Sequence, residues 1–594
     1  MAQINLSYAD RDHAAVVEAG EGCTQRQWGA VRRLFEERSG ATVVAGLRLT
    51  VPWWEFLAHR DALKFVLRSE GLNIVVDHVS GDLLRTAVAR ETAFKARGTR
   101  PMFEQDIEAR LIGLGFTRTL LPYQLRNVSR LSGLVAGATF SVPGSGKTTE
   151  ALAFFFLTRE ADDKLLVVAP NNAFVAWEDE LPACVPSNEG HWARLAGGAD
   201  QIANILSTDP PYCLISYHQL PYVMDALRGY LSRNRVCMFV DESHRMKRGD
   251  DGVHGQCLLR LSYLVRRKLL LSGTPMPNGQ NDLVSQFRFL YPEIRTSADS
   301  VVVDIQGCFV RTTKAELGLP AVVRIEKRVP MTIPQQKLYE VLASDAARHL
   351  EHLDVRDRMR FRSISRCVQH MLQAASNPAL LGRSGIAAHE LMRAAMADGA
   401  SNKIHEACRI AREWVAQGKK VLIWSCFVRS VEHLAGILAD VGAEYIHGGV
   451  TVDEDEENLI SREAVIRRFN DPESGCRVLV ANPAACSEGI SLHHVCHHAI
   501  YVDRNYNAAQ YLQSEDRIHR IGLPQDVTTQ VVILTSPGTI DESVARRLND
   551  KVQRMAIALN DAGLNVSPIP LDELADGIDE DDVNDLKVLL GVSA

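Results

Sequence analysis

Short apolar runs alternate with amphipathic stretches along most of this 594-residue chain. Residues 331–396, near the middle, have a predominantly helical pattern dotted with arginines. The apolar runs form one group before this segment and one group after it, at 165–169, 213–215, 236–240 and 268–271, and at 420–424, 477–480, 498–502 and 529–534. Nearly continuous apolar runs of this length are typical of parallel strands that are buried on both faces. We therefore predict an α/β fold with two parallel-sheet lobes and helical insertions between them.

The first 115 residues follow a different pattern, in which short strand and helix signals alternate as they do in small α+β domains. Residues 41–51 predict a strand, and Trp53, Trp54 and Phe56 follow it. We interpret these aromatic residues as core or domain-interface anchors, with a base-stacking platform as the alternative. The predicted organisation is an accessory α+β domain at 1–115, a first lobe at 116–300, a helical insertion or linker at 301–400, a second lobe with a brace at 401–560 and an acidic tail at 561–594.

The composition is that of an ordinary globular protein, with 46% hydrophobic and 23% charged residues. No apolar run reaches the roughly 18 residues of a membrane span, and no signal-peptide pattern opens the chain. Twelve cysteines without a C-x-x-C pair are typical of a reduced compartment, so we predict a cytoplasmic protein without membrane contact. The net charge of −7 comes from residues 571–594, and the rest of the chain is balanced at 65 basic and 65 acidic residues. A balanced total still permits a local basic groove for nucleic acid.

The predicted first lobe contains a phosphate-binding pattern. Residues 141–148 read S-V-P-G-S-G-K-T, which differs from G-x-x-x-x-G-K-[ST] by a serine at the first glycine. In this pattern the backbone N–H groups surround phosphates, Lys147 reaches the β- and γ-phosphates, and Thr148 holds Mg²⁺. The predicted nucleotide-binding residues here are Gly144, Ser145, Gly146, Lys147 and Thr148. The alternative is a chance turn before a helix.

Two adjacent carboxylates end the apolar run at 236–240. Asp241 at a strand end can bind the Mg²⁺ that bridges two phosphates, and Glu242 can orient the attacking water. His244 is predicted to form a polar link to the neighbouring lobe. A solvated strand end is the alternative interpretation, but the preceding phosphate-binding pattern in the same predicted sheet favours a nucleoside triphosphatase.

The order of further segments resembles the Swi/Snf-related branch of the superfamily two helicase-like ATPases over about residues 120–551, with two RecA-like lobes. L-P-Y-Q ending at Gln124 is similar to the adenine-reading segment of that family. P-x6-W-x-x-E around Trp177 is similar to a DNA-contacting segment, and D-E-S-H-R-M-K beginning at Asp241 is similar to the family's D-E-x-H-R-x-K. The segments at 271–278, 401–404, 420–425, 485–492, 513–522 and 539–551 resemble later motifs of the family, in the family's order.

The resemblance implies roles for residues at these positions. Ser272 and Thr274, with His244, would couple hydrolysis to lobe movement, and Gly489 and Gln513 would help to bind nucleotide. Arg517 and Arg520 would be arginine fingers that stabilise the charge on the transferred phosphate, with a structural salt bridge as the alternative. The predicted catalytic set is thus Lys147, Asp241, Glu242, Arg517 and Arg520, and the cofactors are ATP and Mg²⁺.

The predicted track is double-stranded DNA. Arg356, Arg358, Arg360, Arg362 and Arg366 predict a basic helix that grips the phosphate backbone, preceded by Arg311 and Lys314. A solvated helix face, partly neutralised by nearby aspartates, is an equally weighted alternative. We predict that Trp177, Arg356, Arg360 and Arg362 contact DNA.

The sequence as a whole predicts a DNA-stimulated ATPase that translocates along duplex DNA and remodels protein–DNA or branched DNA structures. Genome maintenance or antiviral defence is the expected setting, with a nuclease or another defence or repair protein as partner. The alternatives are an ATP-switched binding subunit that does not move, a strand-separating helicase and an RNA-directed enzyme. These alternatives are distinguished by which nucleic acid stimulates ATP hydrolysis most strongly.

Overall fold

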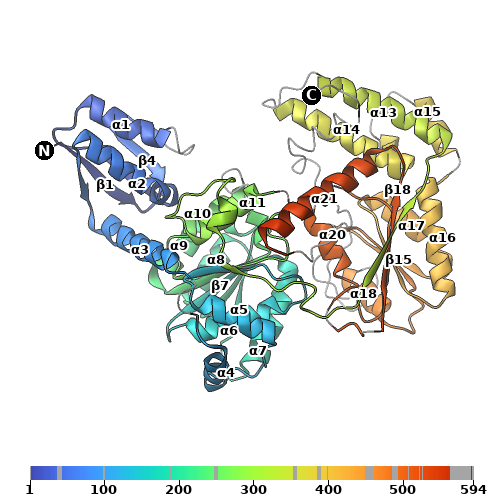
Figure 1. Cartoon of the computed structure of the whole chain (residues 1–594), viewed down its shortest axis with the longest axis horizontal. Helices are drawn as coiled ribbons and strands as arrows, with labels where there is room; N and C mark the ends of the chain where they lie inside the picture. Colours follow the sequence, from blue (N-terminus) through green and yellow to red (C-terminus); the bar gives the residue numbers. More distant parts are fainter. Residues whose placement is uncertain are drawn as a thin grey trace. The chain divides into compact units, whose positions relative to one another are not determined.

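The computed structural model describes most of the chain as two compact units, the first formed by residues 1–142 and 146–312 and the second by residues 143–145 and 313–594 (Figure 1). The described residues are 2–36, 43–97, 101–187, 190–246, 252–277, 279–351, 358–383, 389–397, 399–448, 461–483, 492–505, 508–520, 522–524, 526–561 and 590. The acidic tail predicted at 561–594 therefore lies almost entirely outside the described residues.

The N-terminal part of the first unit is a small α+β layer. Its described strands form a five-stranded sheet in the order β3-β4-β2-β1-β5, in which only β1 and β5 run parallel. Along β1, Ile4 and Leu6 are buried while their neighbours are half-buried, which is the period-two pattern of a strand with one face on a core. The elements are β1 (Gln3–Ala9), β2 (Ala14–Ala19), α1 (Gln25–Glu36), β3 (Val43–Ala45), β4 (Arg48–Pro52), α2 (Trp53–Glu70), β5 (Asn73–Val76) and α3 (His78–Lys95).

The single strand predicted at 41–51 is instead a hairpin. Its described part consists of β3 and β4, which pair antiparallel, and Gly46 in the turn has φ 62°. This left-handed conformation is available to glycine at little cost, so the chain reverses where the apolar pattern alone suggested continuity. Trp53, Trp54 and Phe56 are at most 5% exposed, which confirms them as core anchors rather than a base-stacking platform.

The N-terminal layer is fixed to the rest of the first unit by buried contacts. Arg90 of α3 donates hydrogen bonds to the backbone carbonyls of Tyr263 and Val265. Phe94 lies edge-on against Tyr291, with 4.7 Å between the ring centroids. Because these groups are buried, the accessory domain and the first lobe form one continuous body.

The first lobe is built on a parallel sheet of seven described strands in the order β12-β6-β11-β10-β7-β9-β8. The residues of β7, β9 and β10 are almost all buried, as expected for strands covered on both faces. The four predicted strands of this lobe are confirmed as β7, β9, β10 and β11. The elements are α4 (Glu104–Gly113), α5 (Pro122–Ser132), β6 (Ala136–Thr139), α6 (Lys147–Thr158), β7 (Lys164–Ala169), α7 (Phe174–Cys184), β8 (Trp192–Leu195), α8 (Ala199–Ser207), β9 (Tyr212–Ser216), α9 (Met224–Arg233), β10 (Val236–Asp241), α10 (Val253–Leu261), β11 (Arg267–Leu271), α11 (Asn281–Leu290), α12 (Val301–Asp304) and β12 (Phe309–Val310).

The second unit contains a parallel sheet of six described strands in the order β13-β18-β17-β14-β16-β15. Its four predicted strands are confirmed as β14, β16, β17 and β18. The predicted insertion at 301–400 holds four described α-helices, of which α12 belongs to the first unit and the other three to the second. It also supplies β13, which lies at a sheet edge and pairs with β18. The elements are β13 (Val322–Arg328), α13 (Ile333–Glu351), α14 (Arg358–Ser376), α15 (His389–Met396), α16 (Asn402–Ala416), β14 (Val421–Trp424), α17 (Val428–Ile437), β15 (Ala443–Ile446), α18 (Arg462–Asn470), β16 (Val478–Ala481), β17 (His498–Tyr501), α20 (Ala508–Glu515), β18 (Thr529–Thr535) and α21 (Ile540–Ala558).

The predicted fold class is thus confirmed, with two RecA-like parallel-sheet lobes and a small mixed N-terminal sheet. Within the described part of the chain, no helix is both long enough and apolar enough to cross a membrane.

Candidate functional site

The predicted phosphate loop connects β6 to α6, as the motif requires. Gly144 and Gly146 have φ angles of 81° and 76°, a left-handed conformation that favours glycine. A Cβ at Gly146 would lie 2.4 Å from the side-chain nitrogen of Gln124, so a larger residue there would displace the Gln124 side chain. The loop therefore leads tightly into the first turn of α6, where backbone N–H groups point away from the helix and can bind phosphate.

Lys147 and Gln124 are both held by this loop. The Lys147 Nζ donates to the carbonyl oxygens of Ser141 at 3.1 Å and Val142 at 3.4 Å. The Gln124 side chain accepts from the Leu121 N–H at 2.9 Å and donates to the Gly146 carbonyl at 3.3 Å. The predicted adenine reader thus lies directly beside the predicted phosphate site.

Ser141, the departure from the usual glycine, has a structural explanation. Its buried hydroxyl accepts the Thr312 N–H at 3.0 Å and a hydrogen bond from Thr139 Oγ1 at 3.1 Å. Asn127 Nδ2 donates to Thr312 Oγ1 and to Glu150 Oε2, both at 2.9 Å. Burial raises the pKa of Glu150 to about 7. This polar network behind the phosphate loop could not be identified from the motif, because its members are far apart in sequence.

The two predicted carboxylates lie where β10 ends. Asp241 Oδ1 accepts the Glu242 N–H at 2.9 Å, and Glu242 has the left-handed φ of 49°. Burial and the neighbouring Glu242 charge raise the pKa of Asp241. Burial acts in the same direction on Glu242, but the hydrogen bond and charge of His244, followed by the charge of Lys147, lower its pKa below the usual value. The pKa values of the two carboxylates are therefore shifted in opposite directions.

The three predicted coupling residues come together beside Glu242. His244 Nδ1 lies 3.2 Å from Ser272 Oγ and 3.2 Å from Glu242 Oε2. The Thr274 N–H donates to Ser272 Oγ at 3.2 Å. These contacts all lie within the first lobe, so the structure connects His244 to the segment after β11. Its predicted link to the other lobe stays a prediction.

Trp177 is placed differently from the prediction. Its side chain is fully buried, and its indole N–H donates to Asp241 Oδ2 at 3.0 Å. The neighbouring Glu180 accepts a hydrogen bond from Thr149 Oγ1 at 2.6 Å. A side chain without exposed surface cannot touch a DNA strand, so a direct DNA contact by Trp177 is contradicted. The segment around Trp177 instead braces the candidate active site.

In the second lobe, the residues of the predicted arginine-finger segment surround the end of α20. Arg517 Nε donates to the Gln513 carbonyl at 2.9 Å, and Arg520 lies in the turn that follows. Glu515 is fully buried and accepts two hydrogen bonds from Arg324 of β13, at 2.9 Å and 2.6 Å. Burial opposes the charge of Glu515, but Lys314 and Arg324 lower its pKa to about 2. The finger segment is thus anchored to the edge of the second sheet.

Two basic residues predicted to precede the DNA-gripping helix are used inside the protein. Lys314 lies 2.6 Å from Asp516, and Arg311 donates to the Phe140 carbonyl. Another internal ion pair joins Lys403, from the segment resembling the start of the second lobe, to Asp541 of the brace. Gly489 and Arg356 lie outside the described residues. Arg360 and Arg362 lie on α14, but their side chains are outside the described part.

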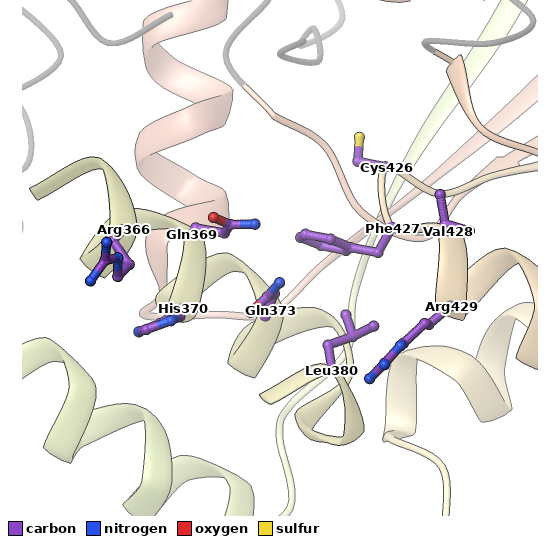
Figure 2. Close-up of a pocket in the computed structure, with 9 residues that line it drawn as sticks. All are labelled: Arg366, Gln369, His370, Gln373, Leu380, Cys426, Phe427, Val428 and Arg429. Atoms are coloured by element: carbon purple, nitrogen blue, oxygen red, sulfur yellow. The ribbon is translucent and has the colours of Figure 1, made fainter. Parts of the chain in front are cut away.

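A pocket of about 560 Å³ lies in the second lobe between α14 and the start of α17, and Figure 2 shows its lining. None of the nine lining residues is acidic. Burial and the charge of Arg366 lower the pKa of His370. Among these lining residues, the sequence predicted a role for Arg366 alone, because the other eight belong to no basic run or recognised motif. The pocket is lined by Arg366, Gln369, His370, Gln373, Leu380, Cys426, Phe427, Val428 and Arg429.

Comparisons with known proteins agree with this geometry. Residues 123–301 match the SNF2-related domain, and residues 402–522 match the helicase conserved C-terminal domain. These two domains define a helicase-like protein with two lobes. The chain belongs to the Swi/Snf-related family of helicase-like ATPases.

Two curated relatives illustrate the similarity. The ATP-dependent DNA helicase DDM1 of Arabidopsis thaliana is 26% identical over 483 residues, which cover 73% of this chain and 61% of the relative. A human SWI/SNF-related matrix-associated actin-dependent regulator of chromatin, subfamily A member 1, is 25% identical over 485 residues, or 75% of this chain and 44% of the relative. The chain thus spans about half the length of these relatives. The solved Sulfolobus solfataricus SWI2/SNF2 ATPase core in complex with dsDNA is 20% identical, with a TM-score of 0.32, and the match covers 75% of this chain and 94% of that chain.

Proposed function

We propose that this protein is a DNA-stimulated ATPase that translocates along double-stranded DNA. The observation that carries the proposal is the arrangement of Lys147, Asp241 and Glu242 at the carboxyl ends of β6 and β10 in one parallel sheet. The positive charge of Lys147 favours the charged form of each carboxylate, although burial and Glu242 raise the pKa of Asp241 overall, so the three side chains lie within electrostatic reach of one another. Ligands of open α/β sheets bind at this edge.

Each residue of the first lobe has a distinct task in the proposed hydrolysis. Lys147 and the backbone N–H groups of the loop ending at Gly146 hold the phosphates. Glu242 orients the attacking water, a task that suits a charged acceptor whose pKa is lowered below its usual value. Gln124, beside the loop, recognises the base.

The residues present fit a Mg²⁺ ion. Asp241 and the Thr148 hydroxyl offer the oxygen ligands that this ion prefers, and each Asp241 oxygen retains acceptor capacity beyond its one hydrogen bond. Partial burial and the neighbouring Glu242 charge raise the pKa of Asp241, and a cation beside this carboxylate would favour its charged form. When bound, Mg²⁺ neutralises negative charge on the phosphates. Thr148 and Asp241 would hold it.

Arg517 and Arg520 are proposed as the arginine fingers of the second lobe. Arginine suits this task because its planar fork binds phosphate oxygens at two points, and such a finger raises turnover by about 10³–10⁵. The anchoring of the adjacent Glu515 to Arg324 fixes the segment that carries both arginines. His244, which contacts Glu242, and Ser272 and Thr274, which are linked to His244 by hydrogen bonds, are proposed to couple hydrolysis to movement.

The proposed DNA contact lies at the pocket between α14 and α17. Arg366 and Arg429 place two positive charges on a polar lining without an acidic residue, a composition that suits phosphate groups. Arg356, Arg360 and Arg362 stay proposed contacts on the same basic segment. The relative DDM1 is named an ATP-dependent DNA helicase, which supports this choice of track.

We further propose that the motor remodels protein–DNA or branched DNA structures in genome maintenance or antiviral defence, with a nuclease or repair protein as partner. The cytoplasmic location of this protein also stays a prediction.

The proposal is tested by ATP turnover of the purified chain without nucleic acid and with duplex DNA, single-stranded DNA or RNA. Turnover stimulated more by duplex DNA than by the other polymers supports a duplex motor. Stimulation by single-stranded DNA or RNA alone would favour a strand-separating helicase or an RNA-directed enzyme. Equal turnover in all four conditions would contradict DNA stimulation.

A further inference from the structure

Two buried aromatic residues outside the predicted catalytic set donate hydrogen bonds to Asp241 and to the backbone of Glu242. The Trp177 indole N–H contacts the side chain of Asp241 at 3.0 Å. The Tyr217 hydroxyl donates to the backbone carbonyls of Asp241 at 2.7 Å and Glu242 at 3.3 Å. Trp177 is 0% exposed and Tyr217 is 1% exposed, so both donor side chains are buried.

The Glu242 backbone requires such support. Its φ of 49° lies in the left-handed region, which non-glycine residues adopt only when their surroundings hold them there. The Glu242 carbonyl also accepts the Arg245 N–H at 3.0 Å, which begins the turn after the strand. Tyr217 therefore fixes the peptide that aims the Glu242 carboxylate.

Trp177 is itself held firmly. Trp192 lies edge-on to it, with ring centroids 6.0 Å apart, and the Trp192 indole N–H donates to the Trp177 carbonyl at 3.0 Å. The Trp177 indole donates to one carboxylate oxygen of Asp241, while the Glu242 N–H donates to the other. The carboxylate plane is thereby fixed by two donors, which is the arrangement that outer contacts of metal ligands adopt.

We propose that Trp177 and Tyr217 are positioning residues, with Trp177 orienting the Asp241 carboxylate toward a divalent cation and Tyr217 holding the strained Glu242 that directs water. This inference rests on the proposed function and extends it to two residues that touch neither nucleotide nor metal. Neither aromatic ring acts by its bulk alone, so replacement by phenylalanine removes the donor and keeps a ring.

The test uses Trp177→Phe and Tyr217→Phe in the full chain, each with a matched control. Trp28→Phe removes a buried indole N–H that donates to the Gly46 carbonyl at 3.2 Å, far from the site in sequence and sheet. Tyr230→Phe removes a buried hydroxyl that donates to the Pro210 carbonyl at 2.6 Å, just before β9, whereas Tyr217 follows the opposite end of β9. The controls match the loss of packing and hydrogen bonding.

Two measurements separate positioning from stability. Isothermal titration of ADP with and without Mg²⁺ gives the factor by which the cation strengthens nucleotide binding. Trp177→Phe is expected to reduce that factor about tenfold, the lower end of the range for lost outer contacts of a metal ligand. Tyr217→Phe is expected to lower kcat about tenfold with KM for ATP unchanged within about twofold, because only water activation is affected. Both controls are expected to match the wild type in both measurements.

A Mg²⁺ factor in Trp177→Phe equal to that of Trp28→Phe, or a kcat in Tyr217→Phe equal to that of Tyr230→Phe, would overturn the corresponding assignment. If Trp177→Phe does not fold, Tyr217→Phe decides, and wild-type kcat in it overturns the proposal. A wild-type protein that binds Mg²⁺-ADP but never hydrolyses ATP would instead overturn the proposed function. The ADP titrations would then still test Trp177.

Discussion

The hydroxyl of Ser141 accepts a hydrogen bond from the backbone N–H of Thr312 at 3.0 Å, and both residues are fully buried. Ser141 opens the phosphate loop, and Thr312 follows β12 at the end of the first unit. The side chain that departs from the usual glycine therefore links the loop to the last strand of its own sheet. A glycine at this position would leave the Thr312 N–H without that acceptor.

Ser141→Ala is expected to lower the free energy of unfolding by about 1–3 kcal/mol, because it leaves buried donors unsatisfied. Urea unfolding followed by circular dichroism measures the change. Ser207→Ala is the control, since the Ser207 hydroxyl donates to the Asn204 carbonyl at an exposed site and should change stability by less than about 0.5 kcal/mol. Equal stability of the two variants would show that the Ser141 hydroxyl is not important.

Glu515→Gln is expected to destabilise the protein at neutral pH. Lys314 and Arg324 lower the folded pKa of Glu515 to about 2 against the effect of burial, whereas the usual pKa of a glutamate is 4.5. An acid with a lowered folded pKa stabilises the fold above its unfolded pKa and loses that contribution as pH falls through the folded value. The variant should lose about 3 kcal/mol at pH 7, and its difference from wild type should shrink between about pH 5 and pH 2.

Unfolding titrations at pH 7, 5 and 3 measure this pH dependence. Glu413→Gln removes an exposed partner of Arg409 and serves as the control, with an expected change below about 1 kcal/mol at every pH. A stability difference for Glu515→Gln that stays constant from pH 7 to pH 3 would contradict the assigned ion pairs.

Lys147→Ala is expected to abolish ATP hydrolysis while leaving the fold intact, because the ammonium group supplies the charge that binds the phosphates. Phosphate release with duplex DNA present measures the activity, and circular dichroism checks the fold. Lys64→Ala removes an exposed lysine paired with Asp61 in the N-terminal layer, and it should retain wild-type turnover. Substantial hydrolysis by the Lys147→Ala protein would contradict the placement of the phosphates.

Arg366→Ala and Arg429→Ala are each expected to weaken duplex DNA binding and to reduce the slope of log affinity against log salt by about one. Fluorescence anisotropy of a labelled duplex at several salt concentrations measures both quantities. Turnover without DNA should not change. Arg348→Ala, which removes an exposed arginine paired with Asp345 on α13, is the control. An unchanged salt slope in both pocket variants would move the DNA contact elsewhere.

Much of the fold could be predicted because buried parallel strands have a strong local pattern. The runs that became β7, β9, β10 and β11 are almost entirely apolar. β6 was not predicted, since its sequence A-G-A-T has low strand propensity and only its place between β11 and β12 makes it a strand. β13 was hidden by its charged, alternating sequence, which suits an edge strand.

The candidate site likewise contains residues that the sequence could place and residues that it could not. Lys147, Asp241 and Glu242 lie in local motifs, so their positions follow from short stretches of sequence. Trp177 lies 64 residues before Asp241. Its hydrogen bond depends on how α7 packs near the end of β10, and no spacing rule gives that contact. The motif resemblance predicted a DNA contact for Trp177. The structure instead shows a buried side chain that contacts Asp241 inside the first lobe.

The most direct test of the central claim is ATP turnover on duplex DNA of increasing length, with Glu242→Gln as the inactive reference. A motor that moves along its track should show turnover that rises with duplex length to a plateau, while Glu242→Gln binds ATP and releases no phosphate above background. Turnover that is independent of duplex length would contradict translocation and favour the ATP-switched binding subunit. Wild-type turnover in Glu242→Gln would contradict the assignment of Glu242 as the residue that activates water.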